Sequence, residues 1–173
     1  MQDSVFTSQA TLLYLLYLTV QIILYRPFTT RPSESSAAQK QKSITESCSA
    51  NVLKMSITAA RSIVQVVSSR KTGKVGGTAV EFYASYYAAG QLLLRIWDLK
   101  TQVKAWKEKQ DKSSILNLLG DEVRNDDSLS LTQEIDGLIA DVHIVMSLYE
   151  KAQARWEFVQ PILYVLNFPC LTS

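Results

Sequence analysis

The chain has 173 residues, of which 47% are hydrophobic, with only six glycines and four prolines. This composition indicates one folded domain with a real core, argues against wholesale disorder, and favours long helices over many turns. With 18 basic and 16 acidic residues the net charge is +2, which excludes nucleic-acid binding driven by bulk charge. Two cysteines, Cys48 and Cys170, exclude a disulfide scaffold and fit a reducing intracellular compartment.

The most apolar segment runs from Leu12 to Phe28 and carries no charge before Arg26. We expect a helix over about Val5–Tyr25, ended by Pro27, which disfavours helical geometry at the residue before it. A helix that is apolar all round is buried either in a core or in lipid. The uncharged run is shorter than the roughly 20 residues that span a bilayer, so a core helix is favoured. A membrane segment over residues 12–25 stays open as the alternative.

Residues 29–42 are polar and Ser-rich, which predicts a flexible surface loop. Ser43 and Glu46 then have the spacing of a capping box and predict the start of a second helix. Apolar residues recur in this helix at three- and four-residue steps and predict its buried face: Ile44, Cys48, Val52, Met55, Ala59, Ile63 and Val66. Cys48 is therefore expected to pack as a small hydrophobic residue rather than to act as a nucleophile.

The order of these segments resembles the fungal-specific transcription factor domain, the helical middle homology region of binuclear zinc-cluster regulators. Members typically show a helix ending in Leu-(His or Tyr)-Arg-Pro-Phe, a Ser-rich connection, and a Cys a dozen or so residues before an Ala-Ala-Arg-x-Ile segment. The matching residues in this chain are Tyr25, Arg26, Pro27, Phe28, Cys48, Ala59, Ala60 and Arg61. The similarity covers about residues 12–67, and beyond them it rests on helical character and on Trp156.

The resemblance implies a non-catalytic regulatory domain that acts in the nucleus and regulates RNA polymerase II transcription. In that family a six-cysteine zinc cluster reads DNA, and two distant cysteines cannot form one. We therefore expect residues 1–173 to be the C-terminal part of such a domain, from a truncated gene product. DNA and zinc would be bound only by a missing N-terminal module, and no cofactor is expected in this chain. Expected partners are a small-molecule inducer and co-regulator proteins. With its covering helices missing, the first helix would expose apolar surface and drive dimerisation or self-association.

A third, long helix is predicted over Thr78 to about Lys109. One stripe at helical spacing contains Ala79, Tyr83, Tyr86, Gly90, Leu93 and Trp97. Core packing is the favoured interpretation of this stripe. Some members of the resembled family bind inducers within the helical domain, and the residues that would form such a ligand pocket here are Tyr83, Tyr86, Gly90 and Trp97.

The last third of the chain predicts two further helical segments. Residues 113–119 form a short apolar helix or turn, and residues 120–130 an acidic loop without the ligand order of a calcium site. Ser130 and Gln133 predict the start of a helix that continues to Gln160, where Pro161 kinks or restarts it. Its inward positions are Leu131, Ile135, Leu138, Ile139, Val142, Val145, Met146 and Tyr149.

Catalysis is not indicated by any constellation in the sequence. His143 is the only histidine, without a metal-binding cluster around it, and there is no nucleophile elbow. No segment alternates with period two between turn signals, so no sheet is predicted. We expect an all-α protein, an irregular bundle of about five helices.

Overall fold

The computed structural model describes residues 2–29, 42–69, 78–114, 125–153 and 159–166. These residues form five helices: α1 (Gln2–Thr29), α2 (Lys42–Ser69), α3 (Ala79–Ser114), α4 (Asn125–Ala152) and α5 (Val159–Leu166). The predicted all-α, multi-helix fold is confirmed, and these ranges contain no strand. Most of the predicted Ser-rich loop, Trp156 and Cys170 lie outside them, as do the side chains of Phe28 and Cys48.

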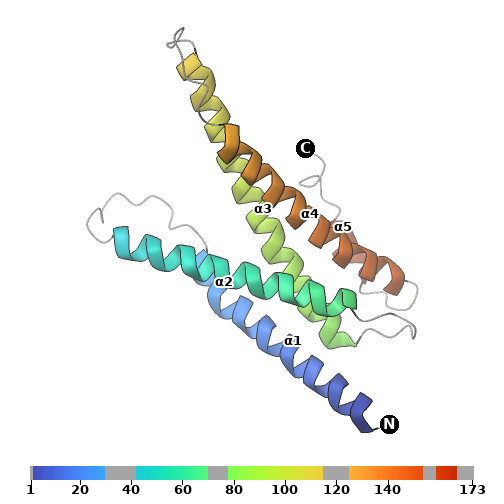
Figure 1. Cartoon of the computed structure of the whole chain (residues 1–173). Helices are drawn as coiled ribbons and strands as arrows, with labels where there is room; N and C mark the ends of the chain where they lie inside the picture. Colours follow the sequence, from blue (N-terminus) through green and yellow to red (C-terminus); the bar gives the residue numbers. More distant parts are fainter. Residues whose placement is uncertain (1, 30–41, 70–77, 115–124, 154–158, 167–173) are drawn as a thin grey trace.

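Helix α3 is the central element of the bundle (Figure 1). It packs against α1, α2 and α4, whereas α1 and α2 lie along each other and α5 packs on α4. Its three neighbours bury side chains along most of its length, from Phe82 to Leu99.

One hydrophobic core joins all five helices. Its largest fully buried side chains are Tyr149, Leu15, Ile22, Ile63, Leu92, Ile96, Leu99, Leu138, Val64, Val142, Val145 and Val159. The Tyr149 hydroxyl donates a hydrogen bond of 2.6 Å to the backbone carbonyl of Phe82, and the two rings lie 5.6 Å apart. This contact fixes the end of α4 against the beginning of α3. The predicted inward positions of α4 are confirmed as buried or half-buried.

A capping box that the sequence analysis did not identify starts α3. The Thr78 amide donates to Oε2 of Glu81 over 2.8 Å, and the Glu81 amide donates to the Thr78 hydroxyl over 3.3 Å. The Thr78 amide precedes the helix and gains a partner in this way, whereas the Glu81 amide also donates to the Thr78 carbonyl over 2.9 Å. Glu81 is almost fully buried, so this reciprocal cap also anchors α3 in the core.

Two predicted boundaries of α4 are wrong. The helix begins at Asn125, so Ser130 and Gln133 lie inside it, and residues 125–130 are not a loop. Acidic residues are favourable in a first helical turn, where they offset the positive end of the helix dipole. The same helix ends at Ala152 rather than at Gln160, and Pro161 lies in the first turn of α5, as a restart requires.

Helix α1 continues through Pro27 to Thr29, so the prediction that Pro27 ends it is wrong. A proline in the last turn removes only one backbone hydrogen bond, and a neighbouring helix can offset this loss. In α2 the predicted inward positions Ala59 and Ile63 are buried, and Val52 and Val66 are half-buried, but Met55 is exposed. The buried face also includes residues that the apolar pattern missed: Ser56, Ala60 and Val64.

Candidate interaction surfaces

Helix α1 is buried on one face only. Leu15, Leu18, Thr19 and Ile22 lie in the core, and the Thr19 hydroxyl donates to the carbonyl of Leu15 over 2.7 Å. The opposite side, here called the α1 outer face, consists of Leu13, Tyr14, Leu16, Tyr17, Val20, Ile23 and Leu24. These seven side chains are 41–68% exposed. The sequence favoured a core helix, which would be covered on every side. This prediction is wrong for the outer half of α1.

The α1 outer face contains no charge, because the sequence has no charged residue between Asp3 and Arg26. Among the described helices, α1 is the one long and apolar enough over Ser8–Pro27 to cross a membrane. The exposure of an apolar surface expected from the sequence is confirmed. Exposed patches of this kind mark contacts with proteins or membranes.

A second exposed apolar surface lies on α3. The side chains of Tyr83, Tyr86, Leu94 and Trp97 are each exposed by two fifths or more, Trp97 by 63%, and they flank Gly90 on the same helix face. We call these five residues the α3 stripe. The sequence placed Tyr83, Tyr86, Gly90 and Trp97 together correctly, but the preferred interpretation that they pack in the core is wrong. A ligand pocket formed by these residues would have to enclose most of the ligand's surface, and this exposed face does not do so.

Small residues explain why the aromatic stripe faces outward. The buried arc of α3 contains Ala84, Ser85, Ala88 and Ala89, and short side chains allow neighbouring helices to approach closely. Larger Phe82, Leu92 and Ile96 fill the remaining space. Three neighbouring helices thus select the alanine-rich side of α3. Tyr83, Tyr86 and Trp97 remain on the more exposed side of α3.

The tyrosines of α3 form an aromatic group of their own. The Tyr83 and Tyr87 hydroxyls lie 3.1 Å apart and share a hydrogen bond, and the Tyr87 ring meets those of Tyr83 and Tyr86 edge to face. The hydrogen bond with Tyr87, and then the electrostatic effect of that same group, raise the pKa of Tyr83 above its ordinary value. With its pKa raised, the Tyr83 hydroxyl is an uncharged donor and acceptor at neutral pH, at the edge of an apolar surface. Amphipathic rings of this kind are common in protein interfaces.

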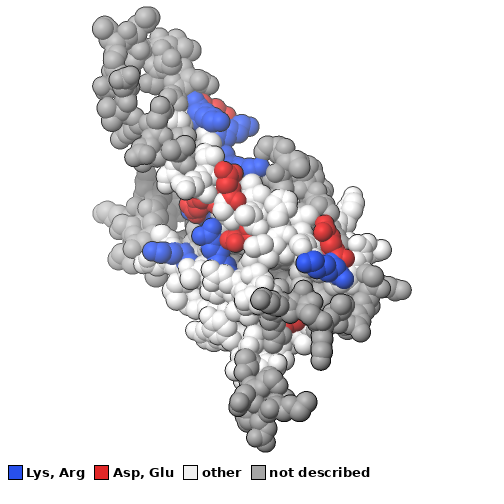
Figure 2. Space-filling view, turned by 45° about the vertical axis from the view of Figure 1, so that its right-hand side comes forward, with Lys and Arg blue, Asp and Glu red and all other residues white. Residues whose placement is uncertain are grey.

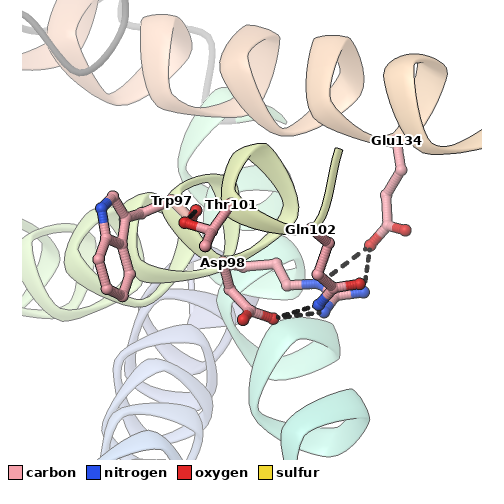
Figure 3. Close-up of polar contacts among 6 residues, drawn as sticks. Trp97, Asp98, Thr101, Gln102 and Glu134 are labelled. Atoms are coloured by element: carbon pink, nitrogen blue, oxygen red, sulfur yellow. Dashed lines mark hydrogen bonds and ion pairs between the residues drawn. The ribbon is translucent and has the colours of Figure 1, made fainter. Parts of the chain in front are cut away.

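A polar contact between α3 and α4 lies beside the stripe. The Arg95 guanidinium contacts Oε1 of Glu134 at 3.1 Å and Oδ2 of Asp98 at 3.3 Å, and the Gln102 amide donates to Asp98 over 2.8 Å. Figure 3 shows Trp97 projecting away from Glu134, so the indole is not part of this contact. Only 18% of the Arg95 side chain is exposed, and the contact holds the two helices together rather than offering a free charge.

The residues that match the fungal domain lie on two adjacent helices. On α1, Tyr25 is half-buried and Arg26 and Pro27 are exposed, with Arg26 in the last turn of the helix. On α2, Ala59 and Ala60 are buried in the core.

Arg61 is the third residue of the α2 match. Its Nε donates to Oδ2 of Asp141 on α4 over 3.0 Å. Gly137, one turn earlier on α4, leaves room for the guanidinium, because a Cβ there would lie 3.2 Å from Nη2 of Arg61. Arg61 therefore has a structural role, as one partner of an ion pair between α2 and α4.

Charges of both signs lie next to each other on the face shown in Figure 2. This arrangement agrees with the small net charge and does not form a basic track for nucleic acid. In the described ranges no three His, Cys, Asp or Glu side chains gather closely enough to hold a metal ion, and His143 is exposed. The chain matches no family model, no curated protein and no solved structure.

Proposed function

We propose that this chain is a non-catalytic regulatory domain of the fungal zinc-cluster class of transcription regulators, acting in the nucleus through other proteins. The observation that carries the proposal is the resemblance of residues 12–67, from the Tyr25-Arg26-Pro27-Phe28 end of α1 to Ala59-Ala60-Arg61 in α2. Its support from the fold is that these segments lie on two helices packed along each other, with Leu18, Ile22 and Ala60 in one core.

The partner that the surfaces favour is a co-regulator protein rather than a small inducer. A small ligand is usually enclosed over most of its surface, whereas the large side chains of the α3 stripe are each exposed by two fifths or more. Exposed Trp and Tyr side chains around a glycine are instead typical of the centre of a protein contact, where such residues contribute most of the binding energy. Tyr86 and Trp97 are thus the proposed anchors of a co-regulator. DNA would be bound through a separate six-cysteine module, since this sequence has two cysteines.

A reporter assay in yeast tests this proposal. The chain is inserted between a heterologous DNA-binding domain and a constitutive activation domain, and reporter transcription is compared with the fusion that lacks it. A regulatory domain changes the output severalfold, and the double variant Tyr86→Ser/Trp97→Ser reduces that change. The matched control Thr101→Ser/Lys104→Ser alters exposed residues further along the same helix face.

Equal reporter output with and without the chain, at equal nuclear protein levels, would refute a regulatory role. If the control variant has the same effect as the stripe variant, the role of Tyr86 and Trp97 is refuted instead.

Membrane association is a second candidate function, favoured by one observation: the apolar Ser8–Pro27 part of α1 exposes an uncharged outer face. An α1 anchor predicts that the protein stays with the membrane pellet after an alkaline wash and is released by detergent. Recovery in the supernatant before any detergent is added would exclude the anchor and leave the regulatory proposal unaffected.

A further inference from the structure

We propose that the α1 outer face binds the same face of a second copy of this chain, with the two α1 helices antiparallel and crossing at the point between Leu18 and Thr19. This inference does not depend on the proposed function. It assigns a partner to the largest exposed apolar surface among the described residues.

The size of the α1 outer face is the first argument. Its seven side chains are 41–68% exposed, and with 150–250 Å² for a whole aromatic side chain they present roughly 600 Å². Complete burial of two such faces would remove at most about 1,200 Å² from solvent, which is the lower end of the range for specific protein interfaces. The largest apolar patch on a typical monomer is about 300–600 Å², so this face is at the upper limit of what monomers expose.

The sequence positions of these residues are the second argument. They are nearly symmetric about the point between Leu18 and Thr19, as an antiparallel contact between identical helices requires. In that register Leu13 lies opposite Leu24 of the other copy, and Tyr17 lies opposite Val20, near the middle of the α1 outer face. At about 100° per residue, Tyr14 and Ile23 lie on opposite flanks of this face, so they border the contact and do not pair with each other. Every central contact occurs twice, as in other two-fold interfaces.

Charge is the third argument, because it favours protein over lipid. Helices that lie on membranes usually carry Lys or Arg along the polar flank, and α1 has no charged residue between Asp3 and Arg26. A helix that crosses the bilayer would have to leave α2 and α3 and uncover Leu15, Leu18 and Ile22, which are buried in their shared core. A second copy covers the outer face without either change.

Cysteine cross-linking tests both the partner and the register. In a background with Cys48→Ser and Cys170→Ser, the single variants Leu13→Cys and Leu24→Cys are prepared, oxidised alone, and oxidised as a mixture. Antiparallel pairing brings residue 13 of one chain to residue 24 of the other. It leaves identical positions about 16 Å apart at 1.5 Å per residue. We expect a disulfide-linked dimer in the mixture and little in either sample alone.

A charge variant tests the same interface in the otherwise native protein. Val20→Glu places a carboxylate on a residue that is already 52% exposed in the monomer, so the fold should persist. In the dimer this charge would be buried twice, and we expect the dissociation constant measured by sedimentation to rise at least about tenfold. Gln65→Glu, at an exposed position of α2, is the control and should leave the constant unchanged.

Several results would overturn the inference. One is a monomeric native protein at concentrations up to about 100 µM; another is cross-linking of Leu13→Cys with itself as efficient as in the mixture. The third is flotation with phosphatidylcholine vesicles that Val20→Glu abolishes, which would assign the α1 outer face to lipid.

Discussion

Replacement of Gly90 by alanine gives the sharpest single test of the α3 stripe. Gly90 lies in the middle of the 36-residue helix α3, and a Cβ built there meets no atom within 4 Å. Glycine inside a helix costs about 1 kcal/mol relative to alanine, and here no contact within the described bundle offsets that cost. Gly90→Ala should therefore increase the free energy of unfolding by about 1 kcal/mol.

Gly137→Ala is the matched control for this measurement. Gly137 also lies inside a long helix, but its Cβ would lie 3.2 Å from Nη2 of Arg61, so the guanidinium must shift. The shift disturbs the 3.0 Å contact between Arg61 and Asp141, and the gain should be smaller than that of Gly90→Ala. Both variants are compared with the native protein by urea unfolding followed by circular dichroism, at one fixed protein concentration because self-association adds to stability.

A decrease in stability for Gly90→Ala would refute this reasoning, since it would mean that another part of the protein occupies the space above Gly90. The reporter assay adds a separate readout. If the co-regulator approaches closely at Gly90, the alanine variant loses regulation although it is more stable. A purely structural role of this glycine cannot produce that combination.

Three further predictions concern buried and paired polar groups. Burial raises the pKa of Tyr149 well above the ordinary value of about 10. The stabilisation that the neutral Tyr149 side chain contributes is therefore complete below pH 10. Above pH 10 it falls by up to about 1.4 kcal/mol per pH unit, because the unfolded chain ionises first. Urea unfolding of native protein and Tyr149→Phe between pH 8 and 11 should therefore show a steeper loss for the native protein. The buried Ser56 hydroxyl has no partner among the described residues, so Ser56→Ala should increase the free energy of unfolding by about 1 kcal/mol. The urea midpoint of this variant should be higher than that of the native protein. Because the Arg61–Asp141 pair is partly exposed, Arg61→Met should cost no more than about 1 kcal/mol, and 1 M NaCl should reduce the difference from the native protein.

The helices were predictable from the sequence where each has one apolar face. In α4 the predicted inward residues from Ile135 to Tyr149 repeat at helical spacing between polar residues, and they are buried or half-buried. In α1 nearly every residue is apolar, so periodicity carries no information about which side meets the core. Only the packing of α1 against α2 and α3 selects Leu15, Leu18 and Ile22.

Capping motifs gave both a missed signal and a wrong prediction. The spacing of Thr78 and Glu81 fits the same rule as that of Ser43 and Glu46, so the start of α3 was readable from the sequence. Ser130 and Gln133 fit the spacing as well, yet they lie inside α4. A capping box is a local pattern, and tertiary packing decides whether a helix extends beyond it. The pairs Arg61–Asp141 and Arg95–Glu134 join residues 80 and 39 positions apart, which no local pattern predicts.

The division of α3 into a small-residue face and an aromatic face has a consequence for testing function. The core uses Ala84, Ala88 and Ala89, so the bundle does not depend on the ring of Trp97, which is 63% exposed. Substitutions at largely exposed positions usually change stability by no more than about 0.5 kcal/mol. A loss of regulation in a Trp97 variant therefore measures partner binding rather than unfolding, whereas a Tyr86 variant needs a parallel stability measurement, because Tyr86 is 44% exposed and packs against the Tyr87 ring. The alanine positions lack this property, because a larger side chain there would push α3 away from its neighbours. The surface of α3 thus allows function to be tested separately from stability.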